Sequence, residues 1–330
     1  MAPPPDAAPE SESKMELPPQ LKTLRDFYYK TALNLHEGAD FVHAPGLLGQ
    51  PKFFTLAHLQ AHLNNPLLMP GYFSLFWQGK KVDCTPAIGH KVIQAAEVPF
   101  LNKGILEEYL SHGASLVLEA IDLLDPLINA MCGAIDAAHE SGPGCVLSNS
   151  VVFFSQTAGG EAYRGHLDTS DVLVVHLDGR KKWRIYERQA PRWVGLNELP
   201  PEKMGPLKAE LVMNPGDALF MKSFTPHLVE TAAPHSLHMS FDICDRAVNA
   251  DTALHLLLEQ YNQAAAPCYA PAEQVLETLT AHATSPGYRR RVAELGAAQK
   301  ENYRSARAMA GANRVTALDR LIALDAPARG

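Results

Sequence analysis

The sequence predicts an α+β protein, in which an antiparallel β-barrel or sandwich lies between N-terminal helices and an appended C-terminal helical module. Short β-type runs follow one another over about 100 residues beyond Cys145, and helical patterns flank them on both sides. Such a series of short strands is typical of a closed or double antiparallel sheet. With 46% hydrophobic and 20% charged residues, the 330-residue chain can bury a sizeable core.

Composition and charge exclude several classes of protein. The net charge of −7, from 29 Lys+Arg and 36 Asp+Glu, argues against a nucleic-acid clamp, so we expect no direct nucleic-acid binding. The five cysteines are scattered without a CxxC pair, which favours a reducing compartment. No stretch approaches the roughly 18 apolar residues of a membrane span. We therefore expect a cytoplasmic protein that does not bind membranes.

The N-terminal part is predicted to be helical after a disordered leader. Residues 1–20 are rich in Pro, Ala, Glu and Ser and offer little to bury. A helical pattern begins at residues 21–29, and a second helix is predicted over 56–63, where Thr55 is a good N-cap. The span 102–140 is predicted to hold more helix, because its apolar residues are too dense for a surface strand.

The middle of the chain is predicted to be β-structure. Five runs of β-forming residues stand in series: 151–154, 172–177, 183–186, 218–221 and 237–241. The pair Asp178-Gly179 separates the second run from the third and predicts a hairpin, because a two-residue loop needs positive φ. We therefore place one domain at 21–246.

Beyond residue 246 the strands stop. Helices are predicted over 251–263, 272–283 and 287–324, separated by prolines. We treat residues 247–330 as a C-terminal helical module that packs on the barrel or forms a homodimer.

Two histidines and one aspartate form the candidate metal site. In His166-Leu167-Asp168 the two outer side chains share a face of a strand, because side chains alternate with period two. His227 follows a turn, a strand and a loop further along the chain. Two histidines and one carboxylate leave three open positions on an octahedral metal, as in non-haem Fe(II) oxygenases. The fourteen histidines of the chain fit metal chemistry.

Lys181 is a candidate anion-binding residue. It shares its parity with the apolar Trp183 and Ile185, so it is predicted to point inward. A buried lysine is costly unless an anion meets it, and an anionic co-substrate beside the metal would do so. The alternative is a lysine at a strand end that bends into solvent.

The last predicted strand has one polar face. This face consists of Ser236, His238, Ser240 and Asp242, and the other consists of Leu237, Met239, Phe241 and Ile243. A polar face in a central strand indicates a hydrated pocket, whereas an edge strand with one wet face gives the same pattern. We take His235, His238, Ser240 and Asp242 as pocket candidates, and Tyr163 and Arg164, next to the metal motif, as candidates for substrate contact.

The run Gly165–Tyr186 resembles the core of the cupin-type JmjC 2-oxoglutarate oxygenases, and most of all the ribosomal oxygenases, which hydroxylate arginine or histidine side chains of ribosomal proteins. Further blocks that fit are 113–118, 215–220, 225–227 and 235–238, so the resemblance covers about residues 40–245. It implies a double-stranded β-helix, also called a jelly-roll or cupin barrel.

The resemblance also implies roles for individual residues. His166, Asp168 and His227 match the Fe(II) ligands, and Lys181 matches the residue that pairs with the distal carboxylate of 2-oxoglutarate. Asn149 or Ser150 matches a polar residue that contacts this co-substrate. We place Ser240 in the same co-substrate site.

The implied activity is an Fe(II)- and 2-oxoglutarate-dependent dioxygenase, which uses O₂ to hydroxylate an arginine or histidine of a protein or peptide, with a ribosomal protein as one candidate. Asp168 must be ionised and both histidines neutral to bind metal, so the metal affinity is expected to fall in mild acid. One alternative keeps the iron chemistry but acts on a small molecule or biosynthetic peptide. A second alternative is a non-enzymatic cupin binding module.

Overall fold

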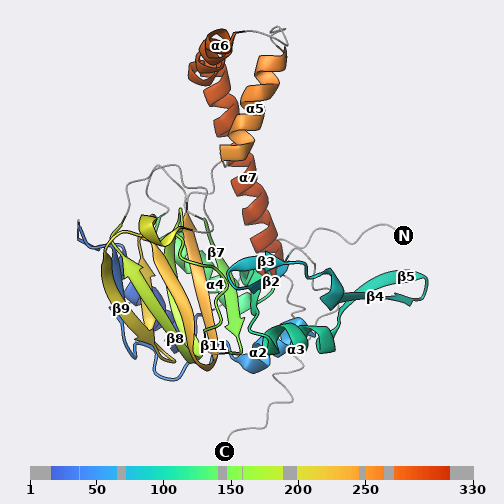
Figure 1. Ribbon diagram of the computed structural model, residues 1–330, viewed down its shortest axis with the longest axis vertical. Helices are drawn as coiled ribbons and strands as arrows, with labels where there is room; N and C mark the ends of the chain where they lie inside the picture. Colours follow the sequence, from blue (N-terminus) through green and yellow to red (C-terminus); the bar gives the residue numbers. More distant parts are fainter. Residues whose placement is uncertain are drawn as a thin grey trace, which may run out of the picture.

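The computed structural model describes residues 16–36, 38–64, 72–139, 147–157, 159–188, 199–244, 250–263 and 271–312. In these segments a nine-stranded antiparallel sheet forms the centre of the molecule (Figure 1). Its strand order is β1-β10-β8-β11-β7-β6-β2-β3, and β9 pairs with β8 off this path. The strands are β1 (Phe41–Ala44), β2 (Phe73–Trp77), β3 (Lys80–Val82), β6 (Ser115–Glu119), β7 (Leu147–Ser155), β8 (Asp171–Tyr186), β9 (Leu207–Met213), β10 (Ala218–Met221) and β11 (His227–Cys244).

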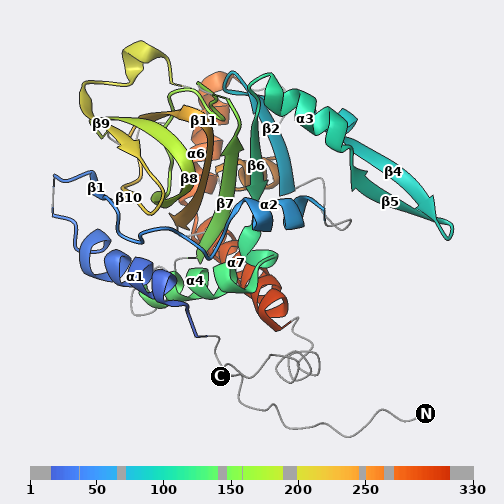
Figure 2. The ribbon, with the colours of Figure 1, turned by 90° about the horizontal axis from the view of Figure 1, so that it is seen from below.

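Helices cover one side of this sheet, and a two-stranded ribbon leaves it. Figure 2 shows α1, α4 and the end of α7 together on one side, and the ribbon β4–β5 extending from the body. The ribbon strands are β4 (Ile88–Ile93) and β5 (Ala96–Leu101). The helices are α1 (Pro19–Phe27), α2 (Leu56–Leu63), α3 (Lys103–Ser111), α4 (Pro126–Ala137), α5 (Ala250–Gln263), α6 (Ala272–Thr284) and α7 (Pro286–Ala312).

Short helical turns complete the chain: a π-helical turn at Tyr28–Ala32 and 3₁₀ turns at Thr85–Ala87, Ile121–Leu123 and Pro201–Lys203. Thr55 caps α2 in a capping box with His58, as its N-cap position predicts. Helix α1 begins at Pro19, so the last two residues of the predicted leader are helical, while residues 1–15 lie outside the described residues. No helix among the described segments is both long and apolar enough to cross a membrane.

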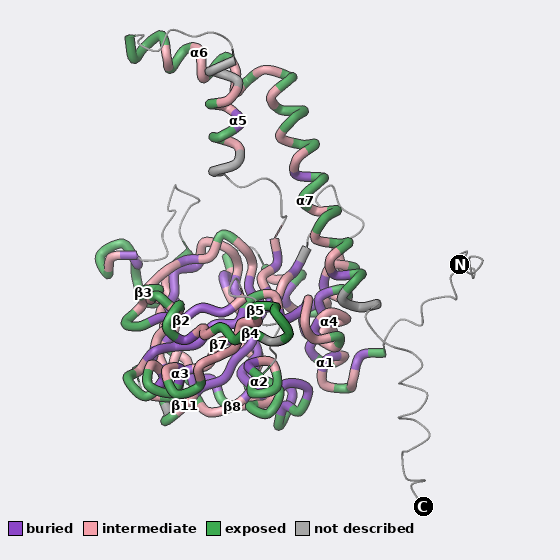
Figure 3. Tube along the Cα trace, turned by 90° about the vertical axis from the view of Figure 1, so that its right-hand side faces the viewer, coloured by how far each residue is buried: buried purple, intermediate pink, exposed green. Residues whose placement is uncertain are grey.

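The alternation of β11 separates the core from a pocket. Leu237, Met239 and Phe241 are fully buried in the main hydrophobic cluster, which also contains residues of α1 and α4. The intervening residues His238 and Ser240 face the other way and line a pocket. Figure 3 shows the buried trace concentrated in the central strands and the exposed trace in the C-terminal arm. The predicted cupin fold, with N-terminal helices and a C-terminal helical region, is confirmed.

The predicted hairpin at Asp178-Gly179 is wrong. Both residues lie within the continuous strand β8, which pairs with β11 on either side of them. The pairing register shifts between Thr231 and Ser236, opposite this point. Gly179 has φ +69°, and a Cβ at this position would overlap the backbone of His235. The glycine therefore allows a β-bulge in which the backbone of His235 comes close to it. It does not form part of a two-residue loop.

The predicted helix over 102–140 is correct only in part. Helices α3 and α4 fall within it, but residues 115–119 form the strand β6 between β2 and β7. Leu116, Val117 and Leu118 are all buried, because one face of β6 meets the core and the other meets Phe76 and its neighbours. A strand buried on both faces loses the alternation that distinguishes it from a helix.

The C-terminal helices form an arm whose base is anchored in the body. Helices α5, α6 and α7 agree with the helices predicted at 251–263, 272–283 and from 287, and residues 313–324 lie outside the described segments. The arm projects from the sheet, and the end of α7 returns to the body (Figure 1). There Arg307 is buried and pairs with Asp122 and Asp136.

Candidate metal centre

The backbone brings the three candidate metal ligands together. His166 and His227 form an isolated antiparallel bridge, in which each backbone N–H donates to the other residue's carbonyl at 3.0 and 2.8 Å. The carbonyl of Asp168 accepts from the N–H of Phe224 at 2.7 Å. The metal motif and the loop before β11 are therefore joined by main-chain hydrogen bonds on both sides of the site.

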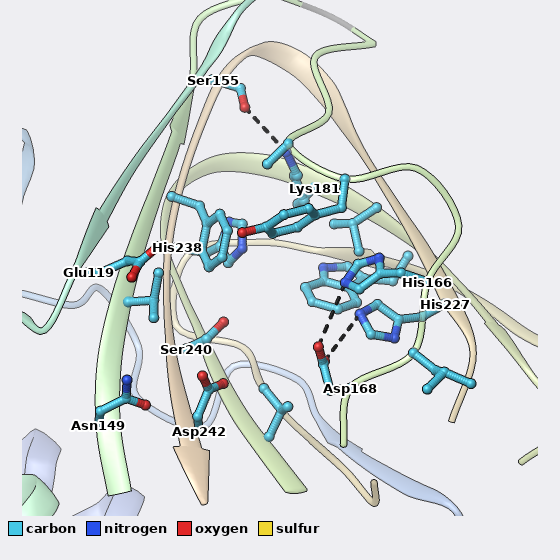
Figure 4. A pocket seen from close by; sticks show the side chains of 18 residues that line it. Glu119, Asn149, Ser155, His166, Asp168, Lys181, His227, His238, Ser240 and Asp242 are labelled. Carbon is cyan, nitrogen blue, oxygen red and sulfur yellow. Dashed lines mark hydrogen bonds and ion pairs between the residues drawn. The ribbon is translucent and has the colours of Figure 1, made fainter. Parts of the chain in front are cut away.

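The ligand atoms of these residues converge. One atom from each of His166, Asp168 and His227 lies within 4.8 Å of the others. The Asp168 carboxylate is 3.9 Å from Nε2 of His166 and 3.7 Å from Nε2 of His227. Figure 4 shows the three side chains pointing at one another on one side of the pocket. This spacing leaves room for one metal ion between them.

The hydrogen bonds of the two imidazoles fix which nitrogen faces the site. Nδ1 of His166 contacts the carbonyl of Arg164 at 2.8 Å, and Nδ1 of His227 contacts the carbonyl of Thr225 at 3.0 Å. Because a carbonyl only accepts, each Nδ1 carries the proton and each Nε2 offers a lone pair. This is the tautomer that allows each Nε2 to bind a metal ion.

Burial keeps these histidines neutral. It lowers the pKa of His166 and of His227 to about 4, with the neighbouring His227 adding to the effect at His166. Burial raises the pKa of Asp168, which the nearby His166 partly reverses. Two neutral imidazoles beside one carboxylate form the donor set that suits a divalent first-row metal, so the residues fit the iron that the sequence predicts.

A pocket of about 280 Å³ extends from the candidate metal centre between β7, β8 and β11. Its wall mixes polar side chains, from β6, β7, β8 and β11 and from the metal motif, with apolar ones. The lining residues are Glu119, Asn149, Val151, Phe153, Ser155, Ala162, Tyr163, His166, Leu167, Asp168, Val172, Lys181, Trp183, His227, Val229, His238, Ser240 and Asp242.

Lys181 points into this pocket, as its parity with Trp183 predicts. The side chain is buried, and its ammonium donates to Thr231 Oγ1 at 3.1 Å and to the carbonyl of Gly160 at 3.2 Å. A third, longer contact joins it to Ser155 Oγ at 3.4 Å. These partners are all neutral, and burial lowers the pKa of Lys181 to about 7. The charges of Glu161 and Glu230 only partly reverse this shift, so an anion in the pocket would give the ammonium a directly bound, charged partner.

The pleat of β7 turns Asn149 and Ser150 to opposite sides of the strand. Asn149 lines the pocket, whereas Ser150 faces the opposite side, where its hydroxyl accepts from the N–H of Asp122 at 2.8 Å. Ser240 lines the pocket on the neighbouring strand.

Three further pocket candidates divide in the same way. His238 and Asp242 line the pocket, but His235 does not. It lies at the bulge, with its Nε2 3.4 Å from a carboxylate oxygen of Asp178.

Of the two candidates for substrate contact before the metal motif, only one lines the pocket. Tyr163 lines the pocket and its ring centroid is 5.1 Å from that of His166. Arg164 is exposed, and its Nε donates to the carbonyl of Gln78 at 3.1 Å outside the pocket.

Sequence reasoning missed Glu119 and Phe153 as pocket residues. Glu119 lies at the end of β6, in the segment mistaken for helix. Phe153 was recognised as a strand residue, and its parity with Asn149 and Ser155 is the signal that could have assigned it to the pocket.

Part of the chain is similar to known proteins. Residues 135–251 match the family described as JmjC domain. Over 85 residues the chain is 31% identical to ribosomal oxygenase 2 of Rattus norvegicus, which is 25% of this chain and 18% of that protein. Over 96 residues it is 28% identical to the bifunctional lysine-specific demethylase and histidyl-hydroxylase NO66 of Drosophila willistoni, covering 28% and 12% of the two chains. The match thus spans less than a fifth of these relatives.

Among solved structures, the chain is similar to YcfD, a ribosomal oxygenase from Escherichia coli, in complex with cobalt and 2-oxoglutarate. The TM-score is 0.45 at 15% identity, over 81% of this chain and 68% of that one. The matched JmjC segment contains all three candidate metal ligands, Lys181 and the strands β7, β8 and β11. Over residues 135–251 the chain therefore matches the JmjC domain, and part of it is similar to the ribosomal oxygenases.

Proposed function

We propose that the protein is an Fe(II)- and 2-oxoglutarate-dependent hydroxylase that acts on an arginine or histidine side chain of a protein or peptide. The observation that carries this proposal is the presence of two neutral imidazoles, a carboxylate and a buried lysine with neutral hydrogen-bond partners in one pocket. When bound by His166, Asp168 and His227, iron would supply the oxidative chemistry that converts 2-oxoglutarate, O₂ and the substrate into succinate, CO₂ and the hydroxylated substrate.

The residues of the chain orient and enclose the reactants. Lys181 holds the distal carboxylate of the co-substrate by charge, while Asn149 and Ser240 offer polar contacts on the facing strands. Phe153 and Tyr163 exclude water from part of the wall.

The acidic part of the pocket favours a cationic substrate. Glu119 and Asp242 line the wall around Asn149 and Ser240 (Figure 4). Carboxylates attract a guanidinium or imidazolium group, and an arginine can donate two parallel hydrogen bonds from its guanidinium to one carboxylate. The names of the relatives, ribosomal oxygenase and histidyl-hydroxylase, support the same class of substrate, with a ribosomal protein as its source.

Two alternatives remain to be separated from this proposal by experiment. A non-enzymatic binding module would not need three converging metal ligands and Lys181 in the same pocket. A small-molecule substrate would use the same iron chemistry, and product analysis distinguishes it.

The proposal extends to the assembly and the location of the protein. Helix α5 exposes Leu254 and Leu258, which are four residues apart and share a helix face, and α6 exposes Leu276. We propose that residues 247–330 form a module that pairs two copies through these leucines, that residues 21–246 form the catalytic domain, and that the protein works in the cytoplasm. Light scattering of the wild type and of Leu258→Glu tests the dimer.

The test of the activity has two steps. Anaerobic titration with Fe(II) and 2-oxoglutarate should show binding, and addition of O₂ should release succinate. Mass spectrometry of candidate basic peptides should then find the mass of one added oxygen atom. No binding of 2-oxoglutarate would exclude the activity, and succinate release with a hydroxylated small molecule alone would favour the small-molecule alternative.

A further inference from the structure

His238 is a buried histidine in the proposed co-substrate pocket that none of the roles above explains. It is 5% exposed and lines the pocket from β11, two residues before Ser240. Figure 4 shows it on the wall that also carries Ser240 and Asp242. A buried imidazole in the middle of a pocket needs a polar partner or a reason to lack one.

The ring of His238 is held firmly by its neighbours. It stacks on Phe153, its cross-strand neighbour, with ring centroids 4.7 Å apart and planes at 4°. Its edge meets Trp183 at 5.9 Å and 75°. Trp183 also stacks on the proposed metal ligand His227, at 5.6 Å and 22°. His238 is therefore one aromatic ring away from the candidate metal centre.

His238 is also one step along the strands from Lys181. The Lys181 ammonium contacts Ser155, which lies two residues from Phe153 on the pocket face of β7. Phe153 pairs directly with His238. The electrostatic effect of Lys181 is one cause that lowers the pKa of His238, after burial. The cation and the imidazole thus lie on adjoining parts of the same wall.

The free nitrogen of His238 is the one that a ligand can reach. Nδ1 is enclosed and has no hydrogen-bond partner among the described residues. An enclosed lone pair costs less than an enclosed N–H, so the proton belongs on Nε2. A neutral imidazole then presents one N–H donor to the pocket. Trp183 Nε1 is an enclosed N–H of the same wall, and it too has no partner in the part of the chain that the structure describes.

We propose that His238 is a second co-substrate residue, which donates from Nε2 to the distal carboxylate held by Lys181. This inference rests on the proposed function, because it needs a 2-oxo dicarboxylate in the pocket. One ammonium and one imidazole N–H would then hold the two oxygens of the carboxylate. The pair would select a dicarboxylate over a 2-oxo acid that lacks the distal group.

The test measures the affinities of two ligands for the Mn(II)-loaded protein by anaerobic calorimetry. The ligands are 2-oxoglutarate and 2-oxobutyrate, which differ by the distal carboxylate. His238→Phe keeps the stacked ring and removes the donor, and His238→Gln restores an N–H near the position of Nε2. His235→Phe, at the bulge outside the pocket, is the matched control.

A hydrogen bond to a charged group predicts that His238→Phe weakens 2-oxoglutarate binding by about tenfold or more. Its affinity for 2-oxobutyrate should equal that of the wild type, and His238→Gln should recover most of the loss. His235→Phe should bind both ligands as the wild type does.

Three results would overturn the inference. They are undiminished 2-oxoglutarate binding in His238→Phe, an equal loss for both ligands, and no recovery in a folded His238→Gln. If the wild type binds Mn(II) but not 2-oxoglutarate, the proposed function itself is refuted. If the wild type binds 2-oxoglutarate and the His238 variants bind it equally well, only the role of His238 is refuted.

Discussion

His166 and His227 are joined through their backbones as well as through the site that their side chains form. Each N–H donates to the carbonyl of the other, at 3.0 and 2.8 Å. These hydrogen bonds do not involve the imidazoles. The two proposed metal ligands are therefore placed by the main chain, and either side chain can be removed without removing the connection.

This relationship predicts that His166→Ala and His227→Ala remain folded but lose metal. Removing a direct ligand should cost more affinity than the roughly 10- to 100-fold that loss of an outer partner costs. Binding of Mn(II), followed by electron paramagnetic resonance, measures the effect, and circular dichroism checks the fold. His235→Ala, which removes a histidine outside the pocket, should bind Mn(II) normally. Wild-type affinity in His227→Ala would contradict the assignment.

Acid should destabilise the protein between pH 6.5 and 4, partly through His176. This histidine is fully buried, and burial lowers its pKa to about 4, against 6.5 for the ordinary residue. The unfolded chain therefore binds more protons in this window, so stability is complete above pH 6.5 and falls as the pH drops towards 4.

Replacing this histidine tests the effect. His176→Leu should reduce the slope of unfolding free energy against pH by up to about 1 kcal/mol per pH unit. Urea unfolding at several pH values measures it. An unchanged slope would show that His176 does not titrate in this way.

The affinity for 2-oxoglutarate should fall as the pH rises above 7. Above that pH, the protein should also take up a proton when it binds 2-oxoglutarate. Burial lowers the pKa of Lys181 to about 7, so the free protein loses the ammonium charge above that pH. A carboxylate partner restores the charge, which requires about one proton per binding event at pH 8 to 9. Calorimetry in two buffers of different ionisation enthalpy measures this uptake.

The sign of the stability effect follows from the same shift. The unfolded lysine keeps its proton to about pH 10.5, so the free protein should gain stability from this group as the pH rises from 7 to 10.5. Lys181→Met should abolish the proton uptake on binding. It should also remove the contribution of Lys181 to the pH dependence of the unfolding free energy. Lys182→Met is the matched control, because Lys182 lies on the other face of β8 and pairs with Glu210. It should change neither the proton uptake nor the pH dependence of stability.

Arg307 should be a major contributor to the anchoring of the C-terminal arm. Its guanidinium pairs with Asp136 and Asp122 and donates to the carbonyl of Asn129 at 3.1 Å. Arg307→Ala would leave two carboxylates of the body without this partner. Breaking a buried ion pair in this way typically costs about 3–5 kcal/mol.

Urea unfolding of Arg307→Ala measures the loss. Arg304→Ala, which changes a half-exposed arginine of the same helix near Glu301, should cost less than about 1 kcal/mol. Equal effects of the two substitutions would show that the buried ion pairs of Arg307 do not anchor the arm.

Gly179→Ala should disturb the bend of β8 next to Lys181. The residue has φ +69°, and the new Cβ would meet the backbone of His235. Both effects destabilise the fold, so the melting temperature should fall by several degrees or more. Gly287→Ala, where a Cβ meets nothing within 4 Å, should leave it unchanged or raise it. A thermally normal Gly179→Ala would show that the bulge tolerates a side chain.

Short-range patterns predicted much of the fold and the candidate site. The alternation along β11 gave both a core face with Met239 and a pocket face with Ser240, because a strand between core and pocket keeps period two. Parity likewise placed Lys181 beside Trp183 on the inner face. In each case the information lies within a few residues of the strand concerned.

Features that depend on distant contacts could not be predicted in this way. Gly179 is required by the approach of His235 across the sheet, so the local Asp-Gly pair suggested a turn instead. Glu119 ends a strand buried on both faces, whose composition suggested a helix. Arg307 is one arginine on a long polar helix, and only its packing against Asp122 and Asp136 distinguishes it.

Anomalous diffraction from crystals grown with Mn(II) and 2-oxoglutarate would test the proposed metal centre most directly. We predict one strong peak within bonding distance of Nε2 of His166, Nε2 of His227 and the carboxylate of Asp168. We also predict a co-substrate that reaches from this peak towards Lys181. A peak elsewhere, or an imidazole of His227 turned away from the ion, would contradict the account.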